Sequence, residues 1–142
     1  MNARELMTPN PACCTPETPL QQVARMMVDC DCGEIPVVER EDFKKLVGVV
    51  TDRDIACRAV AAGRDPLTLT AADVMSSPAV TASERDDLEE VVRLMETHRI
   101  RRIPVVDRNG QVCGIISQAD VARRAARKDT GELVRELSSP TA

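Results

Sequence analysis

The chain has 142 residues, of which 43% are hydrophobic and 30% are charged, and its formal net charge is -4 at pH 7. These values suit a soluble globular domain of ordinary size. Because the chain contains one Phe and neither Tyr nor Trp, the composition argues against sites that stack nucleic-acid bases or sugars on aromatic rings, and the negative charge offers no attraction to a phosphate backbone. We therefore expect no nucleic-acid partner.

The N-terminal segment lacks the features of an export signal. Residues 1–11 show no basic stretch followed by an apolar run. The chain also lacks the run of about 18 apolar residues that a membrane span requires. We therefore expect a cytoplasmic protein with no membrane association, in which the six cysteines are reduced thiols and not a disulfide framework.

The first half of the chain predicts a strand, a helix, two strands and a second helix. A short strand near 12–15 precedes Thr18 and Pro19, which suit the N-cap and first position of a helix. An apolar stripe at the spacing of one helix face follows, comprising Leu20, Val23, Ala24 and Met27. β-branched runs then predict strands at 35–38 and 46–50.

A second helix, predicted at 52–62, leads into a link between the two halves of the chain. Gly63 suits the left-handed residue that closes a helix, and Pro66 blocks continuation. The link ends on a capping-box pattern formed by Thr70 and Asp73. These signals predict a break followed by a new structural unit.

The second half repeats the same order, with residues 6–39 aligned on residues 74–107. Ser83 is the predicted helix cap, with Asp86 three positions later. The apolar stripe recurs as Leu88, Val91, Val92 and Met95. The remaining predicted elements are strands near 79–81 and at 103–106 and 112–116, a hairpin turn at Asn109-Gly110, and a helix at 118–128.

The repeats divide the chain into four parts: a first repeat at 1–66, a linker at 67–72, a second repeat at 73–128 and a tail at 129–142. We predict that the tail is partly disordered, with one short amphipathic turn. Each repeat alone is small for a stable fold, so the two are expected to bury their sheet faces against each other.

Several motifs occur in both repeats: IPVV at 35–38 and 103–106, and GVVTDRD at 48–54 matched by GIISQAD at 114–120. With MTPNP at 7–11, this tandem pattern resembles the paired CBS domain, or Bateman module, over roughly residues 3–128, and it is most similar to small stand-alone bacterial pairs of the hypoxic-response type. The resemblance implies an α/β (α+β) fold of two βαββα repeats about a pseudo-two-fold axis. It also implies two clefts at the repeat interface, a homodimer, an adenine nucleotide as ligand and no required cofactor.

Two strand-to-helix turns carry the chemistry expected of such clefts. Thr51 with Asp54, and Ser117 with Asp120, place a hydroxyl and a carboxylate where unpaired helix N–H groups favour an anion. The Asp can bind both hydroxyls of a ribose, while the Thr or Ser hydroxyl reaches a phosphate. The alternative is that both pairs only cap their own helices.

The family's pattern implies that the two clefts differ in charge. The first nucleotide site is assigned to Thr51, Arg53, Asp54, Val80, Thr81, Ile100, Arg101 and Arg102. The second and weaker site is assigned to Cys14, Cys32, Gly33, Glu34, Ser117 and Asp120. Because adjacent arginines neutralise phosphates and Glu34 repels them, the Asp54 cleft is predicted to take the phosphorylated ligand. The alternative for the arginines is a solvated strand end that pairs with nearby acids.

The cysteines support a second hypothesis, a metal- or redox-responsive interaction protein without bound nucleotide. They include Cys30 and Cys32, but no C-x-x-C pair or regular zinc spacing occurs, so no metal site is predicted. His98 follows a predicted helix, where a cation at the C-terminus is favourable. No catalytic Cys–His arrangement is recognisable, so we expect a regulatory binding module and not an enzyme. The ligand stays open among AMP, ADP, ATP, NAD and S-adenosylmethionine, and the downstream protein target is unspecified.

Overall fold

The computed structural model describes residues 1–127. Its elements in chain order are α1 (Ala3–Leu6), β1 (Thr8–Pro9), α2 (Leu20–Cys30), β2 (Glu34–Arg40), β3 (Phe43–Thr51), α3 (Asp52–Ile55), η1 (Ala56–Val60), η2 (Pro66–Thr68), α4 (Ala71–Val74), β4 (Ala82–Ser83), α5 (Leu88–His98), β5 (Arg102–Val106) and β6 (Val112–Ser117). Residues 118–127 are helical. The predicted tail at 129–142 and the last residue of the predicted helix at 118–128 lie outside the described residues.

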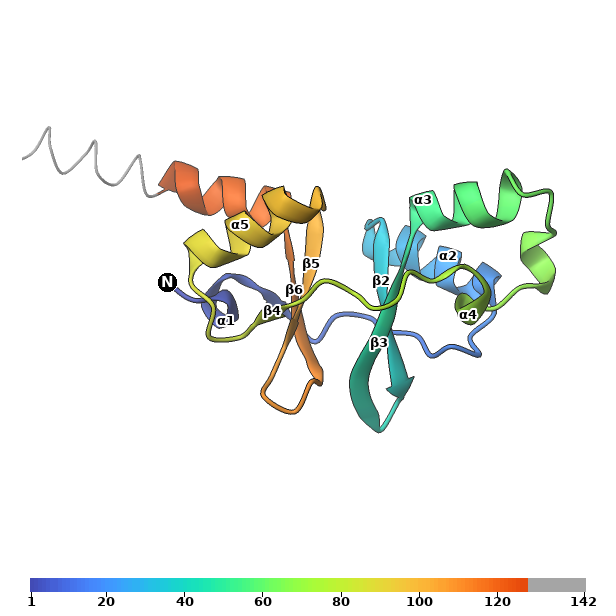
Figure 1. The fold of residues 1–142 in the computed structure, drawn as a ribbon, viewed down its shortest axis with the longest axis horizontal. Coiled ribbons are helices and arrows are strands. Elements are labelled where there is room, and N and C mark those ends of the chain that lie inside the picture. The colour runs from blue at the N-terminus through green and yellow to red at the C-terminus, as the bar shows by residue number, and fades with distance from the viewer. Residues whose placement is uncertain (128–142) are drawn as a thin grey trace, which may run out of the picture.

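Two β-hairpins form the centre of the molecule. β2 and β3 pair antiparallel in one sheet, and the second sheet has the order β1-β6-β5-β4, with β4 parallel to β5. In Figure 1 the hairpins stand side by side, with α2 and α3 outside the first and α5 outside the second. β3 contacts β6 and the turn that precedes it, where the Leu46 N–H donates to the Gly110 carbonyl at 3.1 Å. The four hairpin strands and the mixed α/β class with two repeats confirm the sequence prediction.

The predicted short strands are less extensive than expected. Near 12–15, Cys14 alone forms a bridge, with Val37 of β2. The strand predicted near 79–81 does not form there, and a two-residue strand, β4, begins directly after it, at Ala82. Prolines at 11 and 16 flank the Cys14 bridge, and their missing N–H groups limit the pairing there.

The two long helices are present, but the N-caps predicted for them are wrong. α2 follows Pro19 without a side-chain cap, because the Thr18 hydroxyl accepts instead from the Thr15 N–H at 2.9 Å. α5 is capped by Asp87, whose carboxylate accepts the N–H three residues on at 2.8 Å. Ser83 lies earlier, at the end of β4, where it begins a turn and not the helix.

The link between the halves is partly helical. The predicted Thr70–Asp73 capping box is confirmed at the start of α4, where the Thr70 N–H donates to Asp73 Oδ2 at 2.8 Å. Gly63 has a φ of 74°, as expected of the residue that closes a helix. The helix predicted at 52–62 forms as α3 continued by η1, a turn of π-helix.

Two hydrophobic cores form, and each includes a segment from outside its own hairpin and long helix. The first contains Leu20, Val23, Met27, Ile35, Val37 and Val50, together with Ala71 and Val74 of α4. The second contains Val91, Met95, Ile103, Val105 and Ile116, together with Ala3 and Leu6 of α1. The N-terminal segment therefore packs with the second hairpin, and the link packs with the first. The boundaries predicted at residues 66 and 72 stay a prediction.

Backbone pairing shows the same exchange. β1 pairs with β6, with Thr8 opposite Ile115, and Ser76 pairs with Val49 of β3 through hydrogen bonds of 3.0 and 2.8 Å. A Cβ atom added at Gly48 would lie 2.7 Å from the Ser76 carbonyl oxygen, so only glycine permits this approach. The exchange holds the start of the second repeat against the end of β3.

Candidate functional site

Most of the polar residues assigned to the predicted clefts lie at one edge of the molecule. Figure 1 shows that the N-terminal ends of β2 and β5 and the C-terminal ends of β3 and β6 point to the same side. Strand register places Glu34 opposite Thr51 in the first hairpin and Arg102 opposite Ser117 in the second. Both repeats therefore contribute charged and hydroxyl side chains to one edge.

Both strand-to-helix turns at this edge are capping boxes. Asp54 Oδ2 accepts the Thr51 N–H, and the Thr51 hydroxyl accepts the Asp54 N–H, each at 3.0 Å. Asp120 Oδ2 accepts the Ser117 N–H at 2.9 Å, and the Ser117 hydroxyl accepts the Asp120 N–H at 3.1 Å. The capping role that the sequence left open is therefore present. It uses one oxygen of each carboxylate and leaves Oδ1 for other partners.

Asp54 is buried and surrounded by donors, with 9% of its surface exposed. The Ser76 hydroxyl donates to Oδ1 at 3.1 Å and lies 3.3 Å from Oδ2, and Arg58 Nε is 3.8 Å from Oδ1. Ser76 was not among the predicted site residues. Its sequence signal is its position directly after Met75, which corresponds to Thr8 after Met7 in the first repeat.

Asp120 has a more open environment than Asp54. Arg123, three residues later in the same helix, forms an ion pair with its Oδ1 atom. Burial opposes ionisation of Asp120, but hydrogen bonds from Ser117 and Arg123 outweigh it and lower the pKa of the carboxyl. No side chain from the other repeat contacts Asp120 among residues 1–127 in the way that Ser76 contacts Asp54.

Glu34 is buried at the same edge without the hydrogen bonds that its burial demands. It is 8% exposed, and its Oε2 atom has no hydrogen-bond partner among the described residues. Burial raises the pKa of the carboxyl from 4.5 to about 7, the nearby Arg102 guanidinium partly lowers it, and Asp54 raises it. Charged groups from both repeats therefore influence the ionisation of Glu34.

The residues of the two predicted clefts are not electrostatically separate. Glu34 is assigned to the weaker cleft and Arg102 to the phosphate cleft, but the charge of Arg102 partly lowers the pKa of Glu34. Cys32 joins them, because its thiol donates to the Glu34 carbonyl at 3.6 Å and its pKa, raised by burial, is partly lowered by Arg102. The backbone beside it is fixed by the Asp52 N–H, which donates to the Gly33 carbonyl at 2.9 Å.

The other residues assigned to the clefts differ in how far they are buried. Val80 and Ile100 pack against the second core, and Thr81 is half-buried beside β4. Arg53 and Arg101 are exposed. Cys14 lies in the first core, where burial raises the pKa of its thiol to about 12. The assignment of these residues to ligand clefts stays a prediction.

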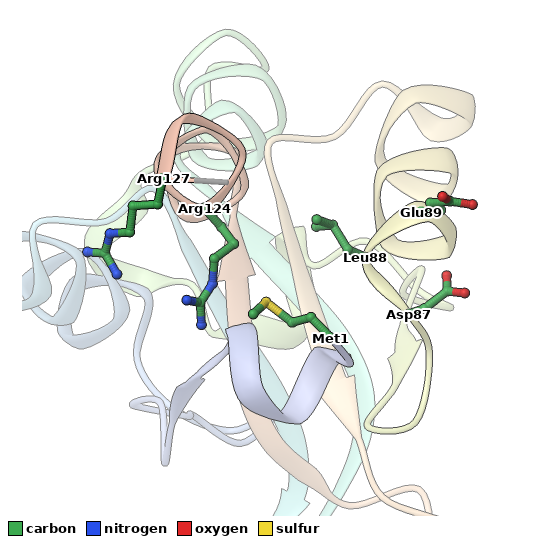
Figure 2. Close-up of a pocket in the computed structure, with 6 residues that line it drawn as sticks. All are labelled: Met1, Asp87, Leu88, Glu89, Arg124 and Arg127. Atoms are coloured by element: carbon green, nitrogen blue, oxygen red, sulfur yellow. The ribbon is translucent and has the colours of Figure 1, made fainter. Parts of the chain in front are cut away.

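A cavity of about 600 Å³ lies away from this edge, between the start of α5 and the helix at 118–127. Figure 2 shows Arg124 extending toward Met1, with Leu88 on the other side of the opening. None of the residues predicted for either cleft lines it. It is therefore distinct from the edge that holds Asp54 and Asp120.

The described part of the chain offers neither a cluster of metal ligands nor a membrane-spanning helix. Across residues 1–127, no three His, Cys, Asp or Glu side chains gather in an arrangement that could hold a metal ion. His98 is the last residue of α5, at the helix end that the sequence predicts. No helix within the same range has the length and apolar character required to cross a bilayer.

Comparison with known proteins gives matches over nearly the whole chain. The family model of the CBS domain matches twice, at residues 3–59 and 71–127. Hypoxic response protein 1 of Mycobacterium tuberculosis is 31% identical over 140 residues, covering 99% of this chain and 96% of the relative.

Solved structures also match most of this chain. A crystal structure of Hypoxic Response Protein I with two coordinated zinc ions has a TM-score of 0.78 and 32% identity over 87% of this chain and 98% of that one. CBSX2 of Arabidopsis thaliana, in complex with AMP, has a TM-score of 0.78 and 25% identity over 90% and 98%. The CBS domain pair of MJ0100, in complex with 5′-methylthioadenosine and S-adenosyl-L-methionine, has a TM-score of 0.79 and 26% identity over 90% and 98%.

Proposed function

The chain belongs to the CBS domain family as a tandem pair, and we propose that it is a regulatory module that binds an adenine nucleotide between its two repeats. The observation that supports the proposal is the shared edge of the two hairpins (Figure 1), to which Asp54, Asp120 and Arg102 all belong. Carboxylates accept hydrogen bonds from the two ribose hydroxyls, and a guanidinium binds phosphate oxygens.

The ligands of the related structures support this chemistry. CBSX2 is in complex with AMP, and MJ0100 is in complex with 5′-methylthioadenosine and S-adenosyl-L-methionine. These ligands share an adenosyl group and differ in the substituent attached to its ribose. Adenosine recognition is therefore the common property that we transfer to this chain. With no aromatic ring near the edge, we propose that aliphatic side chains such as Val80 and Ile100 flank the base.

We further propose that the Asp54 cleft takes the phosphorylated ligand. Isothermal titration with AMP, ATP and S-adenosylmethionine tests this on the unaltered protein and on Asp54→Ala and Asp120→Ala. Asp42→Ala is the matched control, because Asp42 is an exposed carboxylate in the β2–β3 turn. We expect Asp54→Ala to weaken AMP binding at least tenfold, with Asp120→Ala and Asp42→Ala close to the unaltered protein. Equal losses in the two site variants would contradict the asymmetry, and no binding of any ligand would refute the function.

A metal-responsive role is the second candidate, and the zinc-bound relative favours it. Cysteine thiolates and neutral histidine imidazoles are ligands that zinc prefers. Metal content measured on the same purified sample separates the candidates. Stoichiometric zinc without any nucleotide response would support the second. Light scattering on that sample tests the homodimer, which we also propose, and no catalytic step is proposed.

A further inference from the structure

Glu34 combines deep burial with an unsatisfied carboxylate oxygen. It is 8% exposed, and Oε2 has no hydrogen-bond partner among the described residues. Leaving such an atom unpaired is costly, since a buried polar group normally keeps a partner. The side chain is the first residue of β2, opposite Thr51, at the edge proposed to bind the nucleotide. An unpaired buried oxygen at that position indicates a carboxyl group that takes up a proton or binds a ligand.

The neighbouring carboxylate, Asp54, is in the opposite situation. It accepts hydrogen bonds from the Thr51 N–H and the Ser76 hydroxyl and lies 3.8 Å from Arg58 Nε. Two close carboxyl groups repel each other when both are ionised, so one of them favours its neutral form. Because the donors surround Asp54 and none reaches Glu34 Oε2, the proton belongs on Glu34.

Arg102 is the group that opposes this protonation. Arg102 and Glu34 are the first residues of β5 and β2, whose N-terminal ends lie at the same edge (Figure 1), and the charge of Arg102 partly lowers the pKa of both Glu34 and Cys32. Nevertheless, no ion pair within 4.0 Å joins Arg102 to Glu34 in the part of the chain that the structure describes. The guanidinium therefore lies near an ionised Glu34 without being bound by it, and a phosphate could bind it instead.

We propose that Glu34 selects between phosphorylated and phosphate-free ligands because its ionised carboxylate offsets the positive charge of Arg102, so that phosphate binding brings a proton onto Glu34. This inference rests on the proposed function of the edge. An ionised Glu34 offsets the positive charge of Arg102 and repels a phosphate. A neutral Glu34 leaves Arg102 free, and no second negative charge then faces the ligand.

The charges around Glu34 determine the direction of the pH dependence. The charge of Asp54 favours the neutral form of Glu34, and the charge of Arg102 favours the ionised form of Glu34. Asp52 lies beside Gly33, and the Cys32 thiol donates to the backbone carbonyl of Glu34. A bound phosphate engages Arg102 and adds negative charge, and both effects favour the neutral acid. Since the pKa of Glu34 is about 7 without ligand, proton uptake on binding is greatest above that value.

Calorimetric titration at pH 6 and pH 8 tests the inference with AMP and with adenosine, which lacks the phosphate. We expect the affinity for AMP to fall about tenfold between these pH values and that for adenosine to stay constant. The phosphate of AMP itself gains charge in this range, with a second pKa of about 6, and this strengthens binding to an arginine as pH rises. A fall in affinity therefore cannot come from the ligand.

Variants assign the effect to the two residues. Glu34→Gln is expected to bind AMP equally well or better at pH 8 than at pH 6, while Arg102→Gln loses the preference for AMP over adenosine. Glu39→Gln is the matched control, because Glu39 is an exposed glutamate on the same strand. Circular dichroism verifies folding. Should Glu34→Gln not fold, titration of the unaltered protein in buffers of different ionisation enthalpy measures the proton uptake directly. AMP binding without proton uptake would overturn this inference alone, whereas binding of neither ligand would refute the proposed function.

Discussion

The two repeats share one order of elements, yet their edges carry different charges. In the first, Glu34 is buried opposite Thr51, and in the second the residue at the same position is Arg102, opposite Ser117. Asp54 is bonded by Ser76 from the following repeat, whereas Asp120 is paired with Arg123 from its own helix. The backbone arrangement is therefore repeated, and a few side chains at equivalent positions make the two edges unequal.

The largest expected difference between the repeats is in their cores. Leu20 is 1% exposed and its N–H donates to the Leu69 carbonyl at 2.9 Å, so the link covers the start of α2. Leu88, its counterpart, is half-buried and lines the open cavity of Figure 2. We expect Leu20→Ala to destabilise the protein by about 2–5 kcal/mol and Leu88→Ala by about 1 kcal/mol. Urea denaturation measures both, and equal losses would show that the link does not protect the first core.

The next largest effect is a pH dependence that belongs to the first repeat. The pKa of Glu34 is about 7 in the folded chain and 4.5 as its ordinary value. The folded state therefore holds a proton that the unfolded state releases between these values. Its contribution to stability is complete below about pH 4.5 and is lost as pH rises through 7, by at most about 3 kcal/mol. Denaturation curves from pH 5 to 8 should show this fall in the unaltered protein.

The second repeat is expected to make stability depend on pH in the opposite direction at acid pH. The lowered pKa of Asp120 means that its contribution is present above the ordinary value and is lost as pH falls through the folded-state value. Glu34→Gln should remove the dependence near neutral pH and leave the acid limb intact. If that variant keeps the full slope between pH 5 and 8, Glu34 is not the group responsible.

The fold could be predicted from sequence because its signals are local and occur twice. Helical spacing and β-branched runs locate the helices and strands, and the repeated motif locates Asp54 and Asp120 at strand-to-helix turns. The cap at Ser83 failed because Asp87 offers the same chemistry closer to the helix. The effect of Arg102 on the pKa of Glu34 depends on how two hairpins that are far apart in the sequence pack together. No spacing within either repeat contains that information.

Glycine substitutions test the exchange of leading segments between the repeats. A Cβ at Gly48 would lie 2.7 Å from the backbone oxygen of Ser76, whereas at Gly114 the nearest atoms belong to the Met7 side chain. The Met7 Sδ and Cγ atoms can rotate away and leave a contact of 2.9 Å with Met7 Cβ, whereas the Ser76 carbonyl is fixed by its pairing with Val49. We expect Gly48→Ala to cost about 2–3 kcal/mol and Gly114→Ala about 1–2 kcal/mol. Thermal unfolding of both variants checks this order, and the reverse order would contradict the close approach at Ser76.

The smallest expected difference concerns two arginines that accompany the site aspartates. Arg58 Nη1 donates to the carbonyls of Val74 and Met75 at 3.2 and 2.8 Å and so connects the first repeat to the link. Arg123 is 65% exposed and pairs only with Asp120 among the described residues. Since hydrogen bonds from a charged group to backbone carbonyls contribute more than an exposed ion pair, Arg58→Ala should cost about 1–2 kcal/mol and Arg123→Ala less than about 1 kcal/mol.

Salt separates the two mechanisms further. Added salt screens the exposed pair of Arg123 and should reduce the cost of Arg123→Ala toward zero, while the bonds of Arg58 are partly shielded from solvent and its cost should persist. Urea denaturation at low and high ionic strength measures both. If the cost of Arg58→Ala also vanished in salt, Arg58 would act through its 3.8 Å approach to Asp54 and not through the link. The first cleft would then depend on a surface charge pair, as the second does, and the structural difference between the two edges would reduce to Ser76 and Glu34.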